Sequence, residues 1–236
     1  MTSQTTKKAQ RTPPTRPGVY PRGADTVDAI LKAALRVLIE EGASSFTLRR
    51  IAMECGLQVG NVSRHFPRKE MLVQVLLEEL LSPTEGEVKK GIIDTGMPAD
   101  EALALVISGS LDEIQTKKMT RLFIELWAMA NHNDFVAERV ELVYRYVHKM
   151  ISVFVAELNP SLSQDEVEIV SVYISASIEG STMLAGYGKP WSGIMPQIKG
   201  IAVKFLVNLA KTITPEEVRG LSVEMAPVRS GRRKKR

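Results

Sequence analysis

The sequence contains a single cysteine, Cys55, and lacks any apolar run that approaches the ~20 residues needed to cross a bilayer. One cysteine cannot form an internal disulfide framework, which favours a reducing compartment. Residues 1–23 also lack the apolar segment of a secretory signal. We therefore expect neither a secreted nor a membrane-spanning protein.

The sequence is equally poor in motifs that mark enzymes. It has only three histidines and shows no H-E-x-x-H, cysteine pair, nucleophile elbow or glycine-rich phosphate loop. His132 and Asp134 lie at a helix break, but two ligands are too few for a metal site, so we expect both side chains to be solvated. No residue is predicted to be catalytic or to bind a metal or a cofactor.

Basic residues concentrate at the two ends of the chain. Residues 1–23 carry five basic and no acidic side chains, and residues 228–236 carry six basic ones, whereas the whole chain has a net charge of +4. The region between them is therefore net acidic. Because residues 1–23 are rich in Thr, Pro and Lys and have little to bury, they are predicted to be a disordered basic arm. Residues 215–236 are predicted to be a basic C-terminal tail.

Between these ends, apolar residues recur at helical spacing almost throughout, and no segment shows the alternation of a strand. A fourth helix is predicted to begin at 67–69, and Ser82-Pro83-Thr84-Glu85 to end or kink it and start another short helix. Residues 91–98 are predicted to be a linker. The other helices are predicted over 25–41, 47–55, 58–66, 99–117, 119–132, 134–158, 164–186 and 195–213. The sequence thus predicts an all-α fold of nine to ten helices.

Residues 47–66 have the pattern of two short helices joined by a tight turn. Thr47 is placed to cap the first helix, and Gly56 to end it in the left-handed conformation. Val62 and Phe66 give the second helix its own buried pair. The buried side of the first helix is predicted to hold Leu48, Ile51, Ala52 and Cys55. The side chains left pointing outward are Asn61, Ser63 and Arg64. This pattern predicts a helix-turn-helix, and outward Asn and Arg suit base edges and phosphates.

The segment resembles the N-terminal pattern of the TetR family of bacterial transcription regulators over about residues 25–81. The matching residues are Glu40, Gly42, Thr47, Ile51, Ala52, Gly56, Gly60, His65, Phe66, Lys69 and Glu70. The resemblance implies a cytoplasmic bacterial protein with an N-terminal three-helix DNA-binding domain over residues 24–70. A helical ligand-binding and dimerisation domain would follow over residues 71–214. The chain departs from the pattern at Gln58, Ser63 and Arg68, where the family usually has Ser, Tyr and Ser.

The same resemblance and the outward placement of the side chains identify candidate DNA contacts. Those expected in the major groove are Gln58, Val59, Asn61, Ser63 and Arg64. Those expected on the phosphate side are Thr47, Arg49, His65, Arg68 and Lys69. The departures at Gln58 and Ser63 leave the operator sequence open, while Arg68 adds a possible phosphate contact.

The resemblance also implies a cavity for a small molecule among the central helices. The predicted lining residues are Phe123, Trp127, Asn131, Tyr144, Tyr173, Glu179, Met183 and Tyr187. Aromatic and Met side chains at this spacing also fit plain core packing. An inward Glu179 would need a cation or a hydroxyl partner, so we expect it to point outward into solvent. The larger domain loosely resembles the subgroup containing the choline-responsive regulator of betaine synthesis; a cationic or amine-bearing effector is one hypothesis.

The two last long helices have the composition of a subunit interface. Small residues recur at helical spacing over 164–186, and the segment 197–213 is apolar on two sides. Burial inside the monomer is one interpretation; the resemblance instead implies a four-helix bundle across a two-fold axis. The predicted interface residues are Ser177, Gly180, Ser181, Phe205 and Leu209.

The chain is therefore predicted to be a homodimeric, ligand-responsive repressor. It would bind a pseudo-palindromic operator in duplex DNA and be released by a small-molecule effector. Two alternatives stay open: a transcription activator on the same fold, and a small-molecule sensor or adaptor without specific DNA binding. Ser63 in place of Tyr motivates the second alternative.

Overall fold

A computed structural model of the chain describes residues 21–88 and 96–220. Over these ranges the regular structure is entirely helical, with ten α-helices, which confirms the predicted fold class. The chain divides into two compact units, Met1–Glu79 and Leu80–Arg236. None of the helices in the described ranges has both the length and the apolar character needed to span a membrane.

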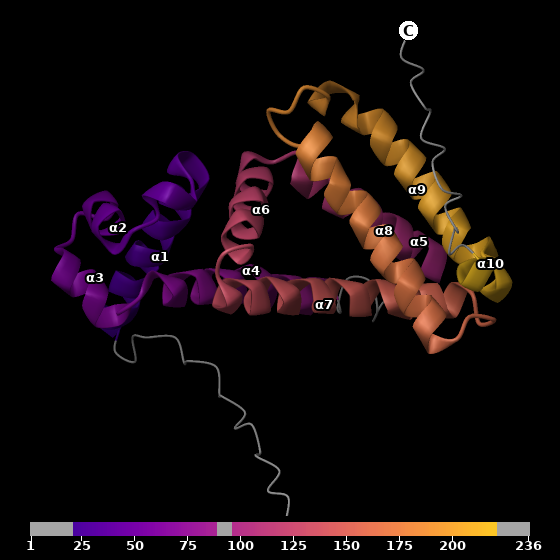
Figure 1. The fold of residues 1–236 in the computed structure, drawn as a ribbon, viewed down its shortest axis with the longest axis horizontal. Coiled ribbons are helices and arrows are strands. Elements are labelled where there is room, and N and C mark those ends of the chain that lie inside the picture. Colours follow the sequence, from indigo (N-terminus) through magenta and orange to yellow (C-terminus); the bar gives the residue numbers. More distant parts are fainter. Residues whose placement is uncertain (1–20, 89–95, 221–236) are drawn as a thin grey trace, which may run out of the picture. The chain divides into compact units, whose positions relative to one another are not determined.

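The first unit contains α1 (Pro21–Glu41), the 3-10 turn η1 (Ala43–Ser45), α2 (Leu48–Glu54), α3 (Val59–His65) and the first half of α4 (Lys69–Val88) (Figure 1). Its fully buried large side chains include Ile30, Leu38, Phe46, Ile51 and Phe66. Residues 21–23, expected in the basic arm, belong instead to α1. A proline is compatible with the first position of a helix, because the amide there has no intrahelical acceptor. The rest of the predicted arm lies outside the described residues.

Helix α4 runs unbroken from Lys69 to Val88, so the expected end at Ser82-Pro83 and the extra short helix are wrong. An interior proline removes one main-chain hydrogen bond and favours a bend, but it does not have to end a helix. The first half of α4 buries Leu72, Val73, Val75 and Leu77. The first compact unit therefore extends to Glu79 and includes the first half of α4.

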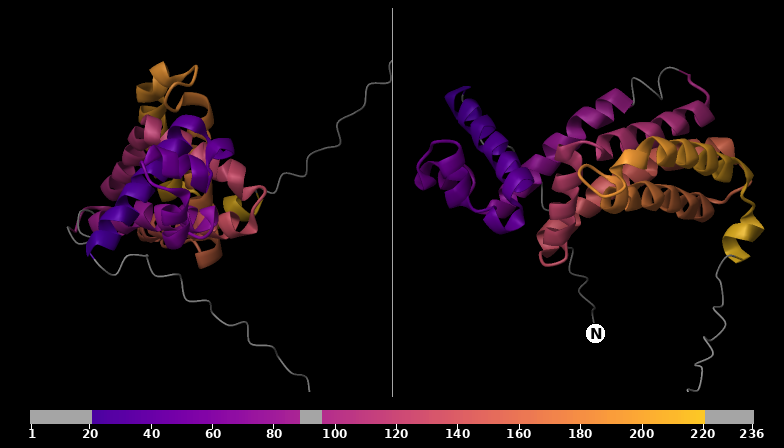
Figure 2. Two further views of the ribbon diagram at one scale, coloured as in Figure 1. Left: turned by 90° about the vertical axis from the view of Figure 1, so that its left-hand side faces the viewer. Right: turned by 90° about the horizontal axis from the view of Figure 1, so that it is seen from above.

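The second unit contains α5 (Ala99–Ile114), α6 (Lys117–Ala130), α7 (Asp134–Leu158), α8 (Gln164–Ala185), α9 (Met195–Thr212) and α10 (Pro215–Gly220). A 3-10 turn, η3 (Ser192–Ile194), precedes α9. Helices α5, α7, α8 and α9 supply the apolar core, with Leu103, Ile107, Ile151 and Ile174 among its fully buried members. Helices α8 and α9 lie side by side in both sets of views (Figures 1 and 2). Since a short turn joins them, they run antiparallel.

Polar caps set several boundaries in this unit. Thr116 caps α6 by accepting a hydrogen bond from Met119 N at 3.2 Å, so α5 and α6 meet about two residues before the expected break. Ser163 begins α8 with a reciprocal capping box to Glu166. Residues 215–220, expected in the C-terminal tail, form α10 instead. Thr214 N donates to the Glu217 carboxylate at 2.8 Å, and Glu217 N donates to Thr214 Oγ1 at 3.2 Å.

Two remaining predictions fall partly outside the described ranges. Of the predicted linker 91–98, only residues 96–98 are described, and they lead into α5 without helical structure. Of the predicted tail, residues 221–236 lie outside the described part of the chain.

Candidate functional site

The first candidate site is the helix-turn-helix of α2 and α3. Thr47 caps α2, since its Oγ1 accepts a hydrogen bond from Arg50 N at 3.1 Å. Gly56 follows α2 with a φ of 68°, a conformation that favours glycine. Leu57 N then donates to Ala52 O at 2.9 Å, which closes the turn. The cap and the left-handed glycine confirm the sequence-based prediction.

Helix α3 buries a single one of its own side chains, Val62, and Phe66 follows it into the core, as predicted. Cys55, expected on the buried side of α2, is only half-buried. The major-groove candidates Gln58, Val59, Asn61 and Arg64 are exposed, and Ser63 is half-buried. His65, expected on the phosphate side, is also half-buried. The outer side of α3 thus presents amide and guanidinium groups, which have the hydrogen-bonding capacity to read base edges.

The remaining DNA candidates lie at helix starts on the surface of the first unit. Thr47 and Arg49 stand at the start of α2, and Arg68 and Lys69 at the start of α4; all four are exposed. Within the described residues, the side chains of Arg49, Arg64, Arg68 and Lys69 form no salt bridge. These cations are therefore available to phosphates.

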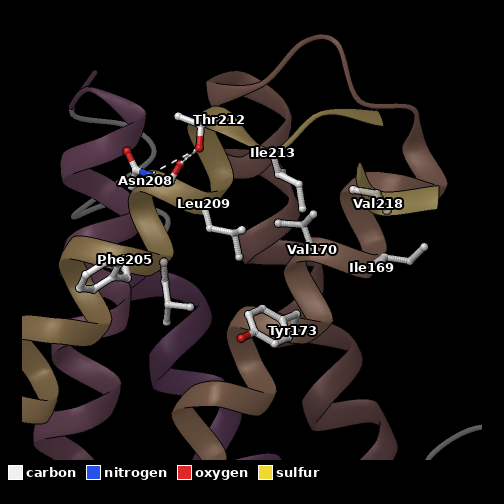
Figure 3. Close-up of a pocket in the computed structure, with 10 residues that line it drawn as sticks. Ile169, Val170, Tyr173, Phe205, Asn208, Leu209, Thr212, Ile213 and Val218 are labelled. Carbon is white, nitrogen blue, oxygen red and sulfur yellow. Dashed lines mark hydrogen bonds between the residues drawn. The ribbon is translucent and has the colours of Figure 1, made fainter. Parts of the chain in front are cut away.

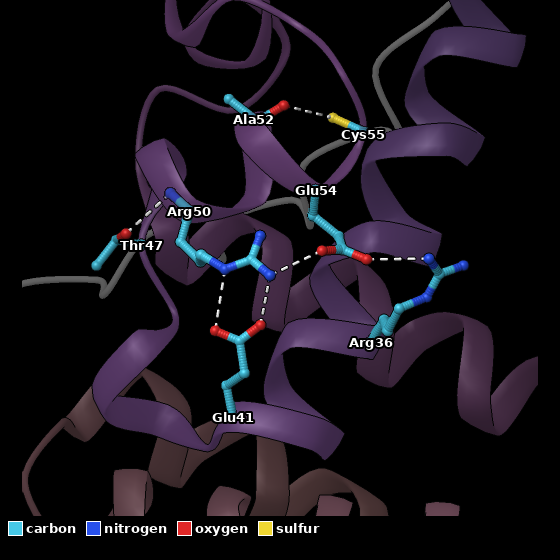
Figure 4. Close-up of polar contacts among 7 residues, drawn as sticks. All are labelled: Arg36, Glu41, Thr47, Arg50, Ala52, Glu54 and Cys55. Atoms are coloured by element: carbon cyan, nitrogen blue, oxygen red, sulfur yellow. Dashed lines mark hydrogen bonds and ion pairs between the residues drawn. The ribbon is translucent and has the colours of Figure 1, made fainter.

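A network of ion pairs joins α2 to α1 (Figure 4). The Arg50 guanidinium donates to both carboxylate oxygens of Glu41, at 3.0 and 2.5 Å, and to Glu54 at 2.8 Å. Arg36 donates to the other oxygen of Glu54 at 2.9 Å. Hydrogen bonds to Glu41 and Glu54 raise the pKa of Arg50, and those from Arg50 and Arg36 lower the pKa of Glu54. We did not predict this network; the i, i+4 spacing of Arg50 and Glu54 was its only local signal.

The second candidate site is an aromatic and acidic cluster formed by α6, α7 and α8. Trp127 Nε1 donates to Tyr144 Oη at 2.6 Å, and the Phe123 ring centroid lies 6.2 Å from that of Trp127 and 6.5 Å from that of Tyr144. Burial and the charge of Glu179 raise the pKa of Tyr144, which places the Glu179 carboxyl group of α8 close to the Tyr144 hydroxyl. The His148 ring lies 6.2 Å from the Tyr144 ring. The cluster joins four predicted lining residues and adds His148, which the i, i+4 spacing from Tyr144 could have identified.

Glu179 points into this cluster, so our expectation of a solvated, outward carboxylate is wrong. The next residue, Gly180, lies on the exposed side of α8, and one helical step turns Glu179 about 100° away from that side. Burial raises the pKa of Glu179 to about 7, and the interaction with the Tyr144 hydroxyl partly opposes this rise. Burial also lowers the pKa of His148. A carboxyl group among aromatic rings is suited to a cation.

The other predicted lining residues lie elsewhere. Asn131 is exposed at the end of α6. Tyr173 and Met183 are exposed on the outer side of α8, and Tyr187 is exposed just after it. None of these four belongs to the cluster around Glu179.

The third feature is an exposed apolar surface on α8 and α9, which we call the α8–α9 face. Of fifteen large apolar side chains exposed among the described residues, ten lie between residues 169 and 205. The residues that define this face are Ile169, Val172, Tyr173, Ala176, Gly180, Met183 and Leu184 on α8, with Ile201 and Phe205 on α9. Predicted interface residues Gly180 and Phe205 lie on it, and Ser177, Ser181 and Leu209 are half-buried. Helix α9 places Leu206 and Ala210 in the core, so burial inside the monomer covers only one of its two apolar sides.

No cluster of metal ligands accompanies these sites. Among the described residues, no three His, Cys, Asp or Glu side chains gather as a metal-binding group. His132 and Asp134 are both exposed.

A helix-turn-helix with an exposed polar second helix, followed by a larger helical unit, defines the class of helix-turn-helix transcription regulators. Residues 30–76 match the model of bacterial regulatory proteins of the tetR family. Residues 99–193 match the model of the C-terminal domain of BetI-type transcriptional repressors. The chain belongs to the TetR family of transcription regulators.

Individual relatives are distant in sequence. The HTH-type transcriptional regulator BetI of Escherichia coli is 22% identical over 165 residues, covering 68% of this chain and 83% of the relative. A transcriptional regulator from Saccharomonospora viridis, solved in complex with choline, has a TM-score of 0.65 at 16% identity and covers 78% of this chain and 96% of its own. FadR from Bacillus subtilis, in complex with stearoyl-CoA, has a TM-score of 0.60 at 18% identity, with coverage of 78% and 97%. These structures share the fold.

Proposed function

We propose that this TetR-family regulator is a repressor that binds a pseudo-palindromic operator as a homodimer and leaves it when a small molecule binds. The exposed side of α3 carries this proposal. Asn61 and Arg64 lie one turn apart on it, while Val62 anchors the helix in the core. Such a helix enters the major groove with its polar side toward the bases. The match to BetI-type repressors favours repression over activation.

In this proposal the two parts of the chain have separate tasks. Residues 24–70 read DNA, with Arg49, Arg68 and Lys69 on phosphates. Residues 71–214 bind the effector and form the dimer. Two symmetric reading heads require half-sites spaced by about 10 base pairs or a multiple of it.

The effector is proposed to be a small organic cation held by the cluster of Phe123, Trp127, Tyr144 and Glu179. Aromatic faces attract cations at ~0.5–2 kcal/mol each, and an ionised Glu179 would add a full counter-charge. A pKa of about 7 means that much of Glu179 would be protonated near neutral pH when no cation is bound. Cation binding would then release a proton. The choline complex of the S. viridis neighbour makes choline the first compound to test.

A mobility-shift assay on DNA from upstream of the protein's own gene tests the DNA part of the proposal. We expect a discrete complex that survives excess nonspecific DNA. If the competitor DNA abolishes the complex completely, the result would favour the sensor or adaptor without specific DNA binding. Transcription in vitro from the same promoter separates the remaining alternative, since a repressor lowers and an activator raises the transcript level.

Titration calorimetry tests the effector part separately. We expect choline to bind and its neutral isostere 3,3-dimethylbutanol to bind at least about tenfold more weakly, because only the charged compound gains from Glu179 and the ring faces. Glu179→Gln should reduce choline affinity while leaving DNA affinity unchanged. Equal affinity for the two compounds would reject the cationic effector and leave the DNA-binding proposal standing.

A further inference from the structure

Helix α8 has two opposite sides of different chemical character. Its outer side lines an open groove of about 540 Å3 together with α9 and α10 (Figure 3). Tyr173 of α8 forms one wall of this groove, and Phe205 and Leu209 of α9 form the other. The described residues that line the groove include no charged side chain, so it offers no counter-charge to a cation. The polar groups that α8 buries lie on its other side.

The inner side of α8 carries a stripe of polar and small residues. Residues three or four positions apart share one side of a helix. At this spacing the stripe runs along α8 to the glycine that follows it, through Ser171, Ser175, Glu179, Thr182 and Gly186. Ser171, Ser175 and Thr182 are 0, 4 and 1% exposed. Since a buried polar group without a hydrogen bond is costly, each of these side chains needs a partner.

Both ends of the stripe are covered by neighbouring helices. At its start, the Ser152 hydroxyl of α7 donates to Ser171 Oγ at 3.1 Å. At its end, Gly186 packs against α6, because a Cβ on Gly186 would lie 2.8 Å from Thr120 Oγ1. The chain itself therefore satisfies the two ends of the stripe.

The middle of the stripe differs from its ends. Among the described residues, the buried Oγ1 of Thr182 has no hydrogen-bond partner. Glu179 lies three residues earlier, about 4.5 Å along the helix axis at 1.5 Å per residue. It is close to the Tyr144 hydroxyl, which already accepts a hydrogen bond from Trp127 Nε1 at 2.6 Å. A carboxyl group and an unpaired hydroxyl thus lie one helical turn apart on the same buried side of α8.

These two groups occupy different parts of a wedge between α6 and α8. The helices converge where α6 begins and α8 ends, and they diverge from there (Figure 1). Farther along α6, Trp127 contacts Tyr144 of α7, which in turn lies close to Glu179. Thr182 is therefore at the narrow end of the wedge and Glu179 in its wider part. Trp127, Tyr144 and Glu179 are only half-buried, so solvent reaches the wide part.

The chemistry of the two parts specifies the two ends of a ligand. The wide part, with a carboxyl group and aromatic faces, suits a bulky cationic group. At the narrow end, the Thr182 hydroxyl can both donate and accept a hydrogen bond. Thr182 lies in the last turn of α8, where the carbonyl groups form the negative end of the helix dipole. A ligand carboxylate would be repelled there and by Glu179, whereas an uncharged alcohol would not.

We propose that Thr182 is the second anchor of the effector site and that its hydroxyl binds an alcohol group of a cationic effector whose charged end lies at Glu179. This inference rests on the proposed cationic effector and specifies its class as a small amino alcohol or its quaternary ammonium form. A plain alkylammonium lacks the group that Thr182 binds, and a zwitterion places a carboxylate where α8 disfavours it. The effector's nitrogen and oxygen are separated by a short link of about two or three carbons, because the anchors are about one helical turn apart.

A cycle of two ligands and two proteins tests the anchor. Calorimetry at pH 8 compares choline with n-propyltrimethylammonium, in which a methyl group replaces the hydroxyl, on wild type and Thr182→Val. Wild type should prefer choline by about three- to tenfold, which is the contribution of one neutral hydrogen bond. Thr182→Val should bind the two compounds within about twofold of each other, and the propyl compound as wild type does. Thr212→Val, an exposed change on α9, is the matched control and should keep the wild-type preference.

Protein stability distinguishes this role from a purely structural one. Because Thr182 Oγ1 has no partner among the described residues, Thr182→Val should leave the midpoint of urea denaturation unchanged or raise it. Thr120→Val, the same substitution at a bonded threonine, should lower the midpoint, since Ile114 O and Tyr187 N each lose a partner. If Thr182→Val lowered the midpoint as much as Thr120→Val, Thr182 would have a partner within the protein and the inference would be overturned.

A third ligand tests the assignment of the alcohol. (Carboxymethyl)trimethylammonium, which carries a carboxylate in place of the hydroxyl, should bind wild type at least about tenfold more weakly than choline at pH 8 because of its repulsion by Glu179. Binding as tight as that of choline would reject the alcohol class.

The outcomes separate this inference from the proposed function. If neither choline nor the propyl compound binds wild type, the cationic effector is rejected, and the second anchor with it. If both bind wild type equally, or if Thr182→Val keeps the preference for choline, the cationic effector stands and the second anchor alone is rejected.

Discussion

At the scale of single residues, Glu179 shows what the sequence could and could not indicate. Its position between Ile178 and Gly180 on an apolar helix identified it as a carboxyl group in need of a partner. The direction in which it points depends on which side of α8 faces α6 and α7. That is a property of tertiary packing, which no local pattern contains. The partners, Trp127 and Tyr144, were each predicted, but their convergence on Glu179 was not.

Glu179→Gln should change how stability depends on pH. Between 4.5 and about 7 the folded protein holds a proton on Glu179 that the unfolded chain has released, so the wild-type free energy of unfolding falls as pH rises. A shift from 4.5 to about 7 corresponds to about 3 kcal/mol, fully expressed above pH 7. Urea denaturation at pH 5 and pH 8 should show Glu179→Gln gaining stability relative to wild type by up to this amount. Glu168→Gln, an exposed change on the same helix, should not; parallel pH profiles for wild type and Glu179→Gln would contradict the prediction.

Gly186 is constrained by close packing at the end of α8. A Cβ there would lie 2.6 Å from Thr182 O and 2.8 Å from Thr120 Oγ1. The same Thr120 hydroxyl donates to Ile114 O and accepts from Tyr187 N, so it cannot move without loss of hydrogen bonds. Gly186→Ala should therefore lower the free energy of unfolding by ~1–3 kcal/mol. Gly109→Ala, in α5 with nothing within 4 Å, should be neutral or stabilise by up to ~1 kcal/mol in the same urea titrations. Equal stability of the two variants would show that the packing relaxes.

At the scale of elements, the helix boundaries were predicted well where a capping residue or a glycine alone determines the end of the helix. The range 134–158 and the end of α1 at Glu41 agree with the structure. The prediction failed at Ser82-Pro83, where the same tetrapeptide fits either a capped helix start or a proline within a continuing helix. The prediction of a C-terminal tail from residue 215 also failed at α10, because it rested on the basic residues after 228. The capping pair Thr214 and Glu217 was visible in the sequence and would have predicted that helix.

The helix-turn-helix prediction separates base reading from phosphate binding. Asn61→Ala and Arg64→Ala should each cost ~1–3 kcal/mol at particular operator positions and relax the base preference there. Lys69→Ala should weaken binding evenly across sequences and reduce the salt slope by about 1. Binding to a set of single-base operator variants at two salt concentrations distinguishes these effects. Unchanged affinity and preference in both α3 variants would exclude α3 as the reading helix.

At the scale of the whole molecule, charge is distributed unevenly between the chain ends and the folded units. The helix-turn-helix region is not basic: residues 24–81 carry seven basic and eight acidic side chains. Residues 1–20 carry four basic and no acidic ones and join directly to α1, which packs against α2. Residues 221–236 carry six basic side chains but follow α10 in the second unit. Long-range attraction to DNA should therefore come from the N-terminal residues.

Removal of residues 2–20 should lower DNA affinity and flatten the plot of log K against log salt, without changing base preference. Each basic residue that displaces a counterion from DNA contributes ~0.9 to the slope, so the loss should reach at most ~3–4 per subunit. Removal of residues 221–236 is the matched control, since it deletes more positive charge from the other unit and should change the slope much less. Fluorescence anisotropy on one operator fragment across a range of salt concentrations measures both slopes. An N-terminal deletion that keeps the wild-type slope, or a C-terminal deletion that flattens it more, would show that the charge acts from a different part of the chain.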